Sequence, residues 1–356
     1  MPKALIITFF AYITFFFSVL PVYSSEDSET KEGPTDFIMH HVQDSHEWHF
    51  ATIGHTHVTL PLPVIIYEIG SGLKFYMSSD FVDEHHNKVE VDGYFIDEHD
   101  HIASSDPSRS FFDISITKNV LTLFISVILL FVVFLSTASK YKKDPLKAPT
   151  GIQSFMEPII LFVRDEIARP TIGEKKYEKF MPYLLSVFFF IWFNNLMGLL
   201  PGAANLTGNI AVTMTLALFT FIITTFSGTK SYWKHIFNTP GVPWWLKLPV
   251  PLMPFVEFIG VLTKPFSLMV RLFANITAGH IIIMSLIALV FIFQSWTVGI
   301  VSVLFGLFMM MIELLVAFIQ AFVFTLLSAI YFGLATEDHE HEPEVSQQKE
   351  LEEISA

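Results

Sequence analysis

The chain has 356 residues, of which 52% are hydrophobic and 38 are Phe, whereas only 15% are charged. This composition is far from that of an ordinary soluble protein and favours a bundle of membrane helices over two or three soluble domains. Because cysteine is absent, disulfide frameworks, thiolate catalysis and cysteine-ligated metal sites are excluded. The formal net charge of −13 is uneven: acidic residues concentrate before residue 114 and after residue 337, and basic residues gather between apolar runs.

Residues 1–24 have the pattern of a secretory signal peptide. Lys3 precedes an apolar core at 4–20, and small residues suited to cleavage lie near Ser24. An uncleaved first membrane helix is the alternative. In both cases we expect the following segment to be exported, and a signal peptide indicates the inner membrane of a bacterium.

The acidic, His-rich segment at 25–113 has no apolar run long enough to span a bilayer. Histidine pairs occur at 40–41 and 85–86, but no ligand spacing accompanies them, so we expect a solvated, partly disordered surface rather than a metal site. A metal-buffering role is the alternative. The β-like run at 58–69 contains two prolines, which predict an edge strand or an extended segment.

The membrane domain is expected at residues 114–337. Five apolar runs have the length that a bilayer core requires, at 119–137, 180–200, 209–226, 256–293 and 296–334. Lysines follow the first run at 140–147 and the third run at 230–247, which places these ends in the cytoplasm. The segment at 25–113 is then periplasmic, and the acidic tail at 338–356 is cytoplasmic.

Residues 151–170 predict an amphipathic helix on the cytoplasmic face, because apolar residues recur at helical spacing between charged ones. The last two runs are much longer than the others. At about 1.5 Å per residue each would reach on the order of 55 Å, beyond the roughly 30 Å of the hydrocarbon layer. These two helices must therefore tilt, bend or run partly along the membrane plane.

Arg271 lies within an otherwise apolar stretch, where its charge costs about 2.5 to 3.5 kcal/mol or more. At about 100° per residue, small and polar residues form one stripe with it. The stripe contains Glu257, Lys264, Ser267, Ala274, Asn275 and Ala278. His280 points to nearly the opposite side, and Glu313 and Gln320 share one face of the last helix. A hairpin between the two long helices could bring His280 to Glu313.

These residues carry a family resemblance. The segments 264–279 (KPFSLMVRLFANITAG), 320–322 (QAF), 195–201 (NLMGLLP) and 209–213 (NIAVT) are similar to subunit a of the F-type ATP synthase. The resemblance covers most of residues 115–337 and gives no help before Lys118. It implies an all-α membrane protein with about five transmembrane helices, an interfacial helix, and two long tilted C-terminal helices that form a hairpin against the rotating c-ring.

The resemblance also implies a proton-conducting stator without catalysis of its own. Arg271 matches the essential arginine that faces the ring carboxylates and bars a leak between two half-channels. His280 and Glu313 match an acid–histidine pair of the outer half-channel, with the two residue types exchanged relative to some members, and Gly198 stands where some relatives have an acid. Ser267, Asn275 and Gln320 match polar residues near the pathway, Glu257 an acid of the inner half-channel, and Asn195 and Asn209 extend the outer pathway.

The expected partners are the c-ring, subunit b with the other stator subunits, and membrane lipid. The expected ion is H⁺, with Na⁺ as the alternative, since that choice rests mainly on the ring carboxylate. No Walker-type loop occurs, so ATP chemistry belongs to partner chains, and we expect no cofactor, no metal and no nucleic acid.

Several alternatives remain at this stage. Arg271 could form a structural ion pair with Glu257 or Glu313, Gln320 and Asn209 could join helices, and Lys264 could snorkel to the inner surface or contact the ring. For the whole chain, the alternatives are an ion-coupled secondary transporter, which commonly shows internal repeats that are not apparent here, and a membrane-anchored periplasmic metal or pH sensor.

Overall fold

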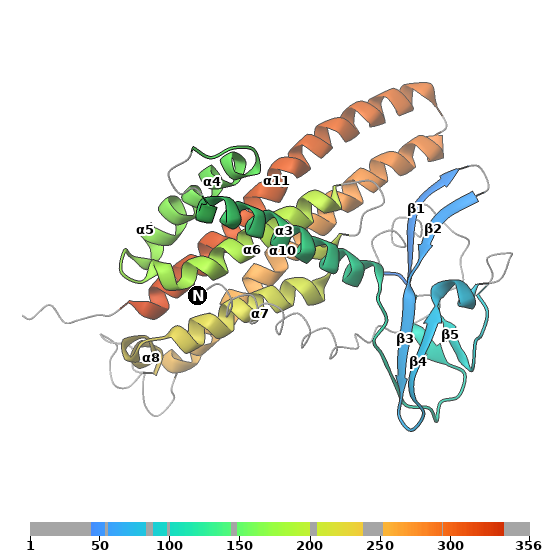
Figure 1. Ribbon diagram of the computed structural model, residues 1–356, viewed down its shortest axis with the longest axis horizontal. Helices are drawn as coiled ribbons and strands as arrows, with labels where there is room; N and C mark the ends of the chain where they lie inside the picture. Colours follow the sequence, from blue (N-terminus) through green and yellow to red (C-terminus); the bar gives the residue numbers. More distant parts are fainter. Residues whose placement is uncertain are drawn as a thin grey trace, which may run out of the picture.

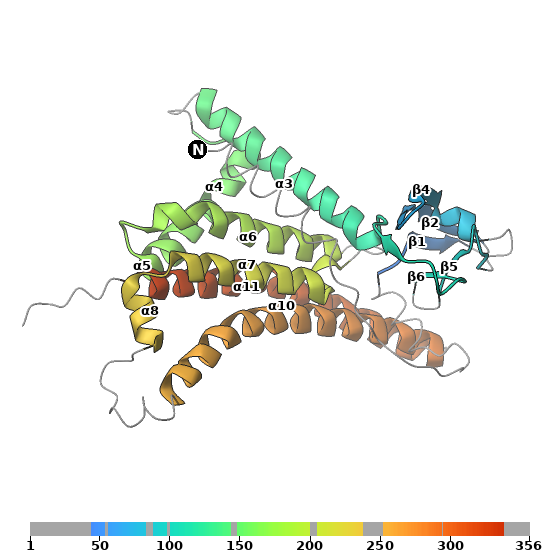
Figure 2. The same cartoon turned by 90° about the horizontal axis from the view of Figure 1, so that it is seen from below.

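A small β-rich domain and a helical bundle follow one another along the chain and along the long axis of the molecule (Figures 1 and 2). The computed structural model describes residues 44–53, 56–82, 88–97, 100–143, 148–199, 205–237, 252–293 and 295–337. The predicted signal peptide at 1–24 and the predicted acidic tail at 338–356 lie outside the described residues.

The β-rich domain contains three antiparallel units: the β1–β2 ribbon, the sheet β4-β3-β7, and the β5–β6 ribbon. Its elements are β1 (Glu47–Ile53), β2 (Thr56–Pro61), β3 (Pro63–Glu68), β4 (Gly72–Met77), the 3₁₀ turn η1 (Ser78–Phe81), β5 (Tyr94–Ile96), β6 (Ile102–Ser104) and β7 (Phe111–Asp113). Buried residues from the strands and from η1 form its core, namely Val64, Ile66, Phe81, Tyr94, Ile96 and Ile102.

The expectation of a solvated, partly disordered surface is wrong for these residues. The run at 58–69 falls into two strands. Its first part belongs to β2, which pairs with β1 in a two-stranded ribbon and is an edge strand as expected, whereas β3 is the central strand of its sheet. Pro63 is the first residue of β3, a position where a missing backbone donor is tolerated. The alternation of β3 turns Val64 and Ile66 inward, and the acidic, His-rich composition around it obscured this signal.

The helical bundle confirms the five expected membrane spans. They are α3 (Lys118–Lys143), α6 (Tyr177–Gly198), α7 (Ile210–Ser227), α10 (Leu252–Phe293) and α11 (Trp296–Thr336). Their ends lie within a few residues of the apolar runs, because these runs are long and bounded by polar or charged residues. A 3₁₀ turn, η3 (Leu206–Gly208), precedes α7.

A bent helical segment occupies the region of the expected amphipathic helix. It consists of α4 (Ile152–Phe162), the π-helical turn η2 (Val163–Ala168) and α5 (Arg169–Ile172). Val163 and Ile167 are fully buried, whereas Arg164 and Arg169 form ion pairs with Asp165, at 2.8 Å and 2.9 Å. With α8 (Lys230–Phe237), α5 lies at the end of the bundle opposite the β-rich domain (Figures 1 and 2).

The two last helices have 42 and 41 residues, as their apolar runs predict. Figure 2 shows α10 as an arc whose concave side faces away from α6, α7 and α11. Pro265 lies inside α10 and removes one intrahelical hydrogen bond, which favours bending. α10 therefore bends, which is one of the ways in which a helix of this length fits a bilayer.

Candidate functional site

Arg271 lies on the open side of α10. Leu268, Leu272 and Ile276 are buried and pack α10 against the bundle, whereas the Arg271 side chain is exposed, together with its stripe neighbours Ser267, Ala274, Asn275 and Ala278. In the part of the chain that the structure describes, no carboxylate forms an ion pair with Arg271. The alternative of a structural ion pair with Glu257 or Glu313 is therefore not realised.

His280 and Glu313 meet on the opposite side of α10, as the predicted hairpin requires. His280 Nε2 lies 3.8 Å from Glu313 Oε1, and both side chains are largely buried. Neither carboxylate oxygen of Glu313 has a hydrogen-bond partner among the described residues. An unsatisfied buried carboxylate is costly for the fold, so its placement calls for a functional explanation.

One glycine makes room for this pair, and a second glycine lies beside it. A Cβ atom at Gly279 would lie 2.9 Å from Glu313 Oε1, closer than real Cβ contacts come. A Cβ atom at Gly198 of α6 would lie 3.6 Å from His280 Nε2, which is ordinary contact. Gly279 therefore admits the Glu313 carboxylate, and Gly198 brings α6 beside His280.

A hydrogen-bonded polar group lies between α6, η3 and α11. Asn195 Nδ2 donates to the carbonyl oxygen of Ala317 at 3.3 Å, and Thr207 Oγ1 donates to Asn195 Oδ1 at 2.6 Å. Gln320 is buried on the same helix, two turns beyond Glu313. Thr207 was not identified from the sequence, because a threonine in a short connection between two apolar runs has no distinctive pattern around it.

Asn209 has a local role in the structure. Its side-chain oxygen accepts a hydrogen bond from the backbone nitrogen of Ala211 at 2.9 Å and so caps α7. Asn209 therefore has a structural role at the start of α7, which was not predicted from the sequence. The predicted role in the outer pathway is a separate one.

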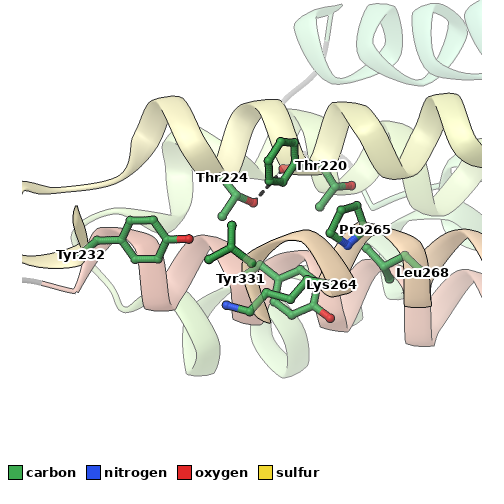
Figure 3. A pocket seen from close by; sticks show the side chains of 9 residues that line it. Thr220, Thr224, Tyr232, Lys264, Pro265, Leu268 and Tyr331 are labelled. Atoms are coloured by element: carbon green, nitrogen blue, oxygen red, sulfur yellow. Dashed lines mark hydrogen bonds between the residues drawn. The ribbon is translucent and has the colours of Figure 1, made fainter. Parts of the chain in front are cut away.

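Lys264 and Glu257 belong to a second polar region, near α8. The Lys264 ammonium lies 5.4 Å from the ring centroid of Tyr331, a cation–π geometry, in a small pocket also lined by Tyr232 (Figure 3). The Glu257 carboxylate interacts electrostatically with the Lys264 ammonium. Burial raises the pKa of Tyr232, and the negative charge of Glu257 raises it further. Within the chain, the contact of Lys264 is therefore with Tyr331 of α11.

Above this pocket a chain of hydroxyl groups crosses the bundle. Tyr183 of α6 and Thr220 of α7 lie 2.8 Å apart at their oxygens, and Thr220 Oγ1 lies 3.3 Å from Ser328 Oγ of α11. Thr220 and Thr224 appear beside Lys264 and Tyr331 in Figure 3. Three helices thus share polar contacts inside an otherwise apolar core, which fixes their register.

Two family models match the chain. "ATP synthase A chain" matches residues 120–333, and "Domain of unknown function (DUF8433)" matches residues 37–122. The chain is 40% identical over 320 residues to ATP synthase subunit a 2 of Chlorobaculum tepidum, covering 88% of this chain and 76% of the relative. It is 39% identical over 310 residues to ATP synthase subunit a of Chloroherpeton thalassium, covering 85% of this chain and 77% of the relative.

A third relative, ATP synthase subunit a 2 of Prosthecochloris aestuarii, is 48% identical over 242 residues, which cover 66% of this chain and 73% of that protein. The first family model spans more than half of the chain and contains all of the polar positions described above. The similarity to the first two relatives extends well beyond the membrane domain. The chain therefore belongs to the ATP synthase A chain family.

Proposed function

We propose that Arg271 is the point at which this subunit acts on the c-ring, and that His280 and Glu313 lie in the half-channel that opens to the outside. The chain is the proton-conducting stator subunit a of the membrane sector of an F-type ATP synthase, and it works with the c-ring and subunit b. It is non-catalytic. The observation that carries the proposal is the placement of an exposed arginine and a buried acid–histidine pair on opposite sides of α10.

The concave side of α10 has the shape that a cylindrical ring of helices would fit. Around Arg271, the exposed stripe of this helix consists of small residues. Ala274 and Ala278 allow another helix to approach closely, so the guanidinium can reach a ring carboxylate. A fixed cation favours the ionised form of that carboxylate and so promotes proton release beside it. Because the guanidinium keeps its own proton, it also blocks direct transfer between the two half-channels. Ser267 and Asn275 line this contact.

The acid–histidine pair suits proton transfer on the other side of α10. Both groups exchange protons readily. His280 Nε2 and Glu313 Oε1 are 3.8 Å apart, so a small side-chain movement brings them to the roughly 2.6 to 3.2 Å over which a proton is transferred. Asn195 and Gln320 supply polar groups beside the pair. α10 ends and α11 begins at the end of the bundle nearer the β-rich domain, which supports an outward opening (Figures 1 and 2). Glu257 serves the inner half-channel at the opposite end.

The chain is a multi-pass membrane protein. We assign it to a bacterial inner membrane, with the β-rich domain in the periplasm and the C-terminus in the cytoplasm. The support is the segregation of charge: α5 carries Arg169 and α8 carries two lysines, and both helices lie at the end opposite the β-rich domain. On this assignment residues 1–24 are a signal peptide, 25–113 are periplasmic, 114–337 form the membrane domain and 338–356 are a cytoplasmic tail.

The test is ATP-driven proton pumping in inverted membrane vesicles that carry Arg271→Ala, with Arg271→Lys as the charge-conserving comparison. We expect coupled pumping to vanish in Arg271→Ala while the amount of assembled complex, measured by co-purification of the ring, stays at the wild-type level. Pumping near the wild-type rate in Arg271→Ala would show that the arginine is only structural.

A further inference from the structure

One face of the sheet β4-β3-β7 is apolar and exposed. Paired positions place eight side chains on this face, because directly opposite residues in antiparallel strands point to the same side. They are Pro63, Ile65 and Tyr67 of β3, Leu73, Phe75 and Met77 of β4, Phe112 of β7, and Ile114, whose backbone nitrogen donates to the carbonyl oxygen of Ile65. We call these eight residues the apolar sheet face. Phe75 is 68% exposed, Phe112 57% and Leu73 56%.

The charged residues of the same strands lie on the other face. Lys74 Nζ is 2.7 Å from Glu68 Oε2, Arg109 Nε is 3.8 Å from Glu68 Oε1, and Tyr76 donates to Asp92. A sheet with one face on its own core and the other in water normally presents polar side chains to the water. Here the core-side face carries the charges and the exposed face carries no ionised side chain. An exposed apolar face of this kind marks a site of interaction.

The apolar sheet face is attached rigidly to the first membrane span. Pairing with β3 continues beyond β7, since the backbone nitrogen of Ile116 donates to the carbonyl oxygen of Pro63 at 3.1 Å, and α3 begins at Lys118. Asp44 accepts hydrogen bonds from the Thr117 hydroxyl at 2.8 Å and from the backbone nitrogen of Asn119 at 3.1 Å. The four residues between β7 and α3 span at most about 14 Å.

The orientation of the domain turns this face toward the helices. β5, which covers the core side, lies farther from the helices along the long axis than β4 does, in both views (Figures 1 and 2). On α3 itself, Phe124, Ile125 and Ile128 are exposed. Along the chain, the apolar sheet face is thus followed directly by a helix with exposed apolar residues.

We infer that the apolar sheet face rests on the bilayer surface beside α3, with Tyr67, Phe75 and Phe112 inserted among the lipid headgroups and upper acyl chains. Tyrosine favours this interfacial depth, and phenylalanine is typical of the apolar face of segments that lie in the interface. Only four residues, which span at most about 14 Å, separate the last strand of this face from the first membrane span. A lipid surface requires no matching charges, whereas the rim of a protein interface is normally polar. The domain thus acts as a monotopic anchor, a role independent of the proton pathway.

The absence of cysteine permits a direct test in the assembled complex. A single cysteine replaces Phe75 or, in a second variant, Phe112, and carries the fluorophore NBD; labelling of the unsubstituted complex gives the background. The matched control is Glu90→Cys, an exposed position of the same domain outside the apolar sheet face. The complexes are reconstituted in phosphatidylcholine–phosphatidylglycerol vesicles, and quenching by aqueous iodide is compared with quenching by phosphatidylcholine that is spin-labelled high on its acyl chain.

We expect NBD at both Phe positions to be quenched by the spin-labelled lipid at least threefold more than NBD at residue 90, and to be protected from iodide. Iodide quenching equal to that of the control would show a face in water and overturn the inference. Protection from both quenchers would also overturn it, because a protein partner would then cover the face. Because Phe75 and Phe112 are exposed, neither substitution removes a core contact.

Discussion

Gly279→Ala tests the reason for the glycine beside the acid–histidine pair. The new Cβ would lie 2.9 Å from Glu313 Oε1, and ordinary contact begins at 3.4 Å, so the carboxylate must move by about 0.5 Å. Moving the end of a side chain away from its preferred rotamer costs about 0.5 to 1.5 kcal/mol. If this strain falls on the transfer between His280 and Glu313, the step slows by about 2- to 13-fold, since 1.36 kcal/mol corresponds to a factor of about ten.

The assay is the initial rate of ATP-driven proton uptake by inverted vesicles, normalised to the amount of assembled complex. Gly306→Ala is the control, because nothing lies within 4 Å of its added Cβ and it gains the same helix propensity. We expect the control to pump at the wild-type rate and Gly279→Ala to fall within the stated range. Equal rates for the two variants would refute the reasoning, because the position of the Glu313 carboxylate would then be without consequence.

Three further predictions concern packing, capping and pH. Gly333→Ala would place a Cβ on the carbonyl oxygen of Thr171, so overpacking of about 1 to 3 kcal/mol should lower the amount of chain found in membranes by immunoblot; a wild-type amount would contradict this. Asp44→Ala removes the cap of α3, costs about 0.5 to 2 kcal/mol, and should speed proteolysis of the β-rich domain in spheroplasts; an unchanged rate would argue against the cap. His46 Nε2 lies 3.7 Å from Asp113 Oδ2. Burial lowers the pKa of His46, but the nearby Asp113 carboxylate has the larger effect and raises this pKa above 6.5. Burial raises the pKa of Asp113, but its interactions with His46 and Ser115 have the larger effect and lower this pKa below 3.8. The pair should therefore stabilise the domain fully between about pH 4 and 6.5 and less as pH rises through the pKa of His46, so proteolysis should be faster at pH 8 than at pH 5.5 in wild type but not in His46→Asn.

The membrane domain was largely predictable because its signals are local. Apolar runs bounded by lysines give the spans, and a rotation of about 100° per residue separates Arg271 from His280 before any packing is known. The proximity of His280 and Glu313 was expected from a hairpin of the two long helices together with the family resemblance. The contact of Thr207 with Asn195 did not, because it joins a short connection to another helix and depends on packing.

The β-rich domain was harder to predict for a physical reason. Its strands are short, and its core combines residues that are far apart in the chain, such as Val64 and Ile102. Local polarity around the histidines suggested a solvated segment, whereas non-local pairing decides the fold. Pro63 illustrates the difference: a proline inside an apparent strand argues for an edge, but at the first residue of β3 it is compatible with the centre of the sheet.

The direct passage from β7 into α3 limits how this subunit can adapt to the membrane around it. A single helix on a loose tether follows a thinner or thicker bilayer by tilting or by sliding along its axis. α3 has little of this freedom, because Asp44 and the continued pairing of Ile116 hold its first turn against a folded domain. Changes in bilayer thickness must then be met by the lipid next to α3, or by a movement of α3 and the β-rich domain as one body.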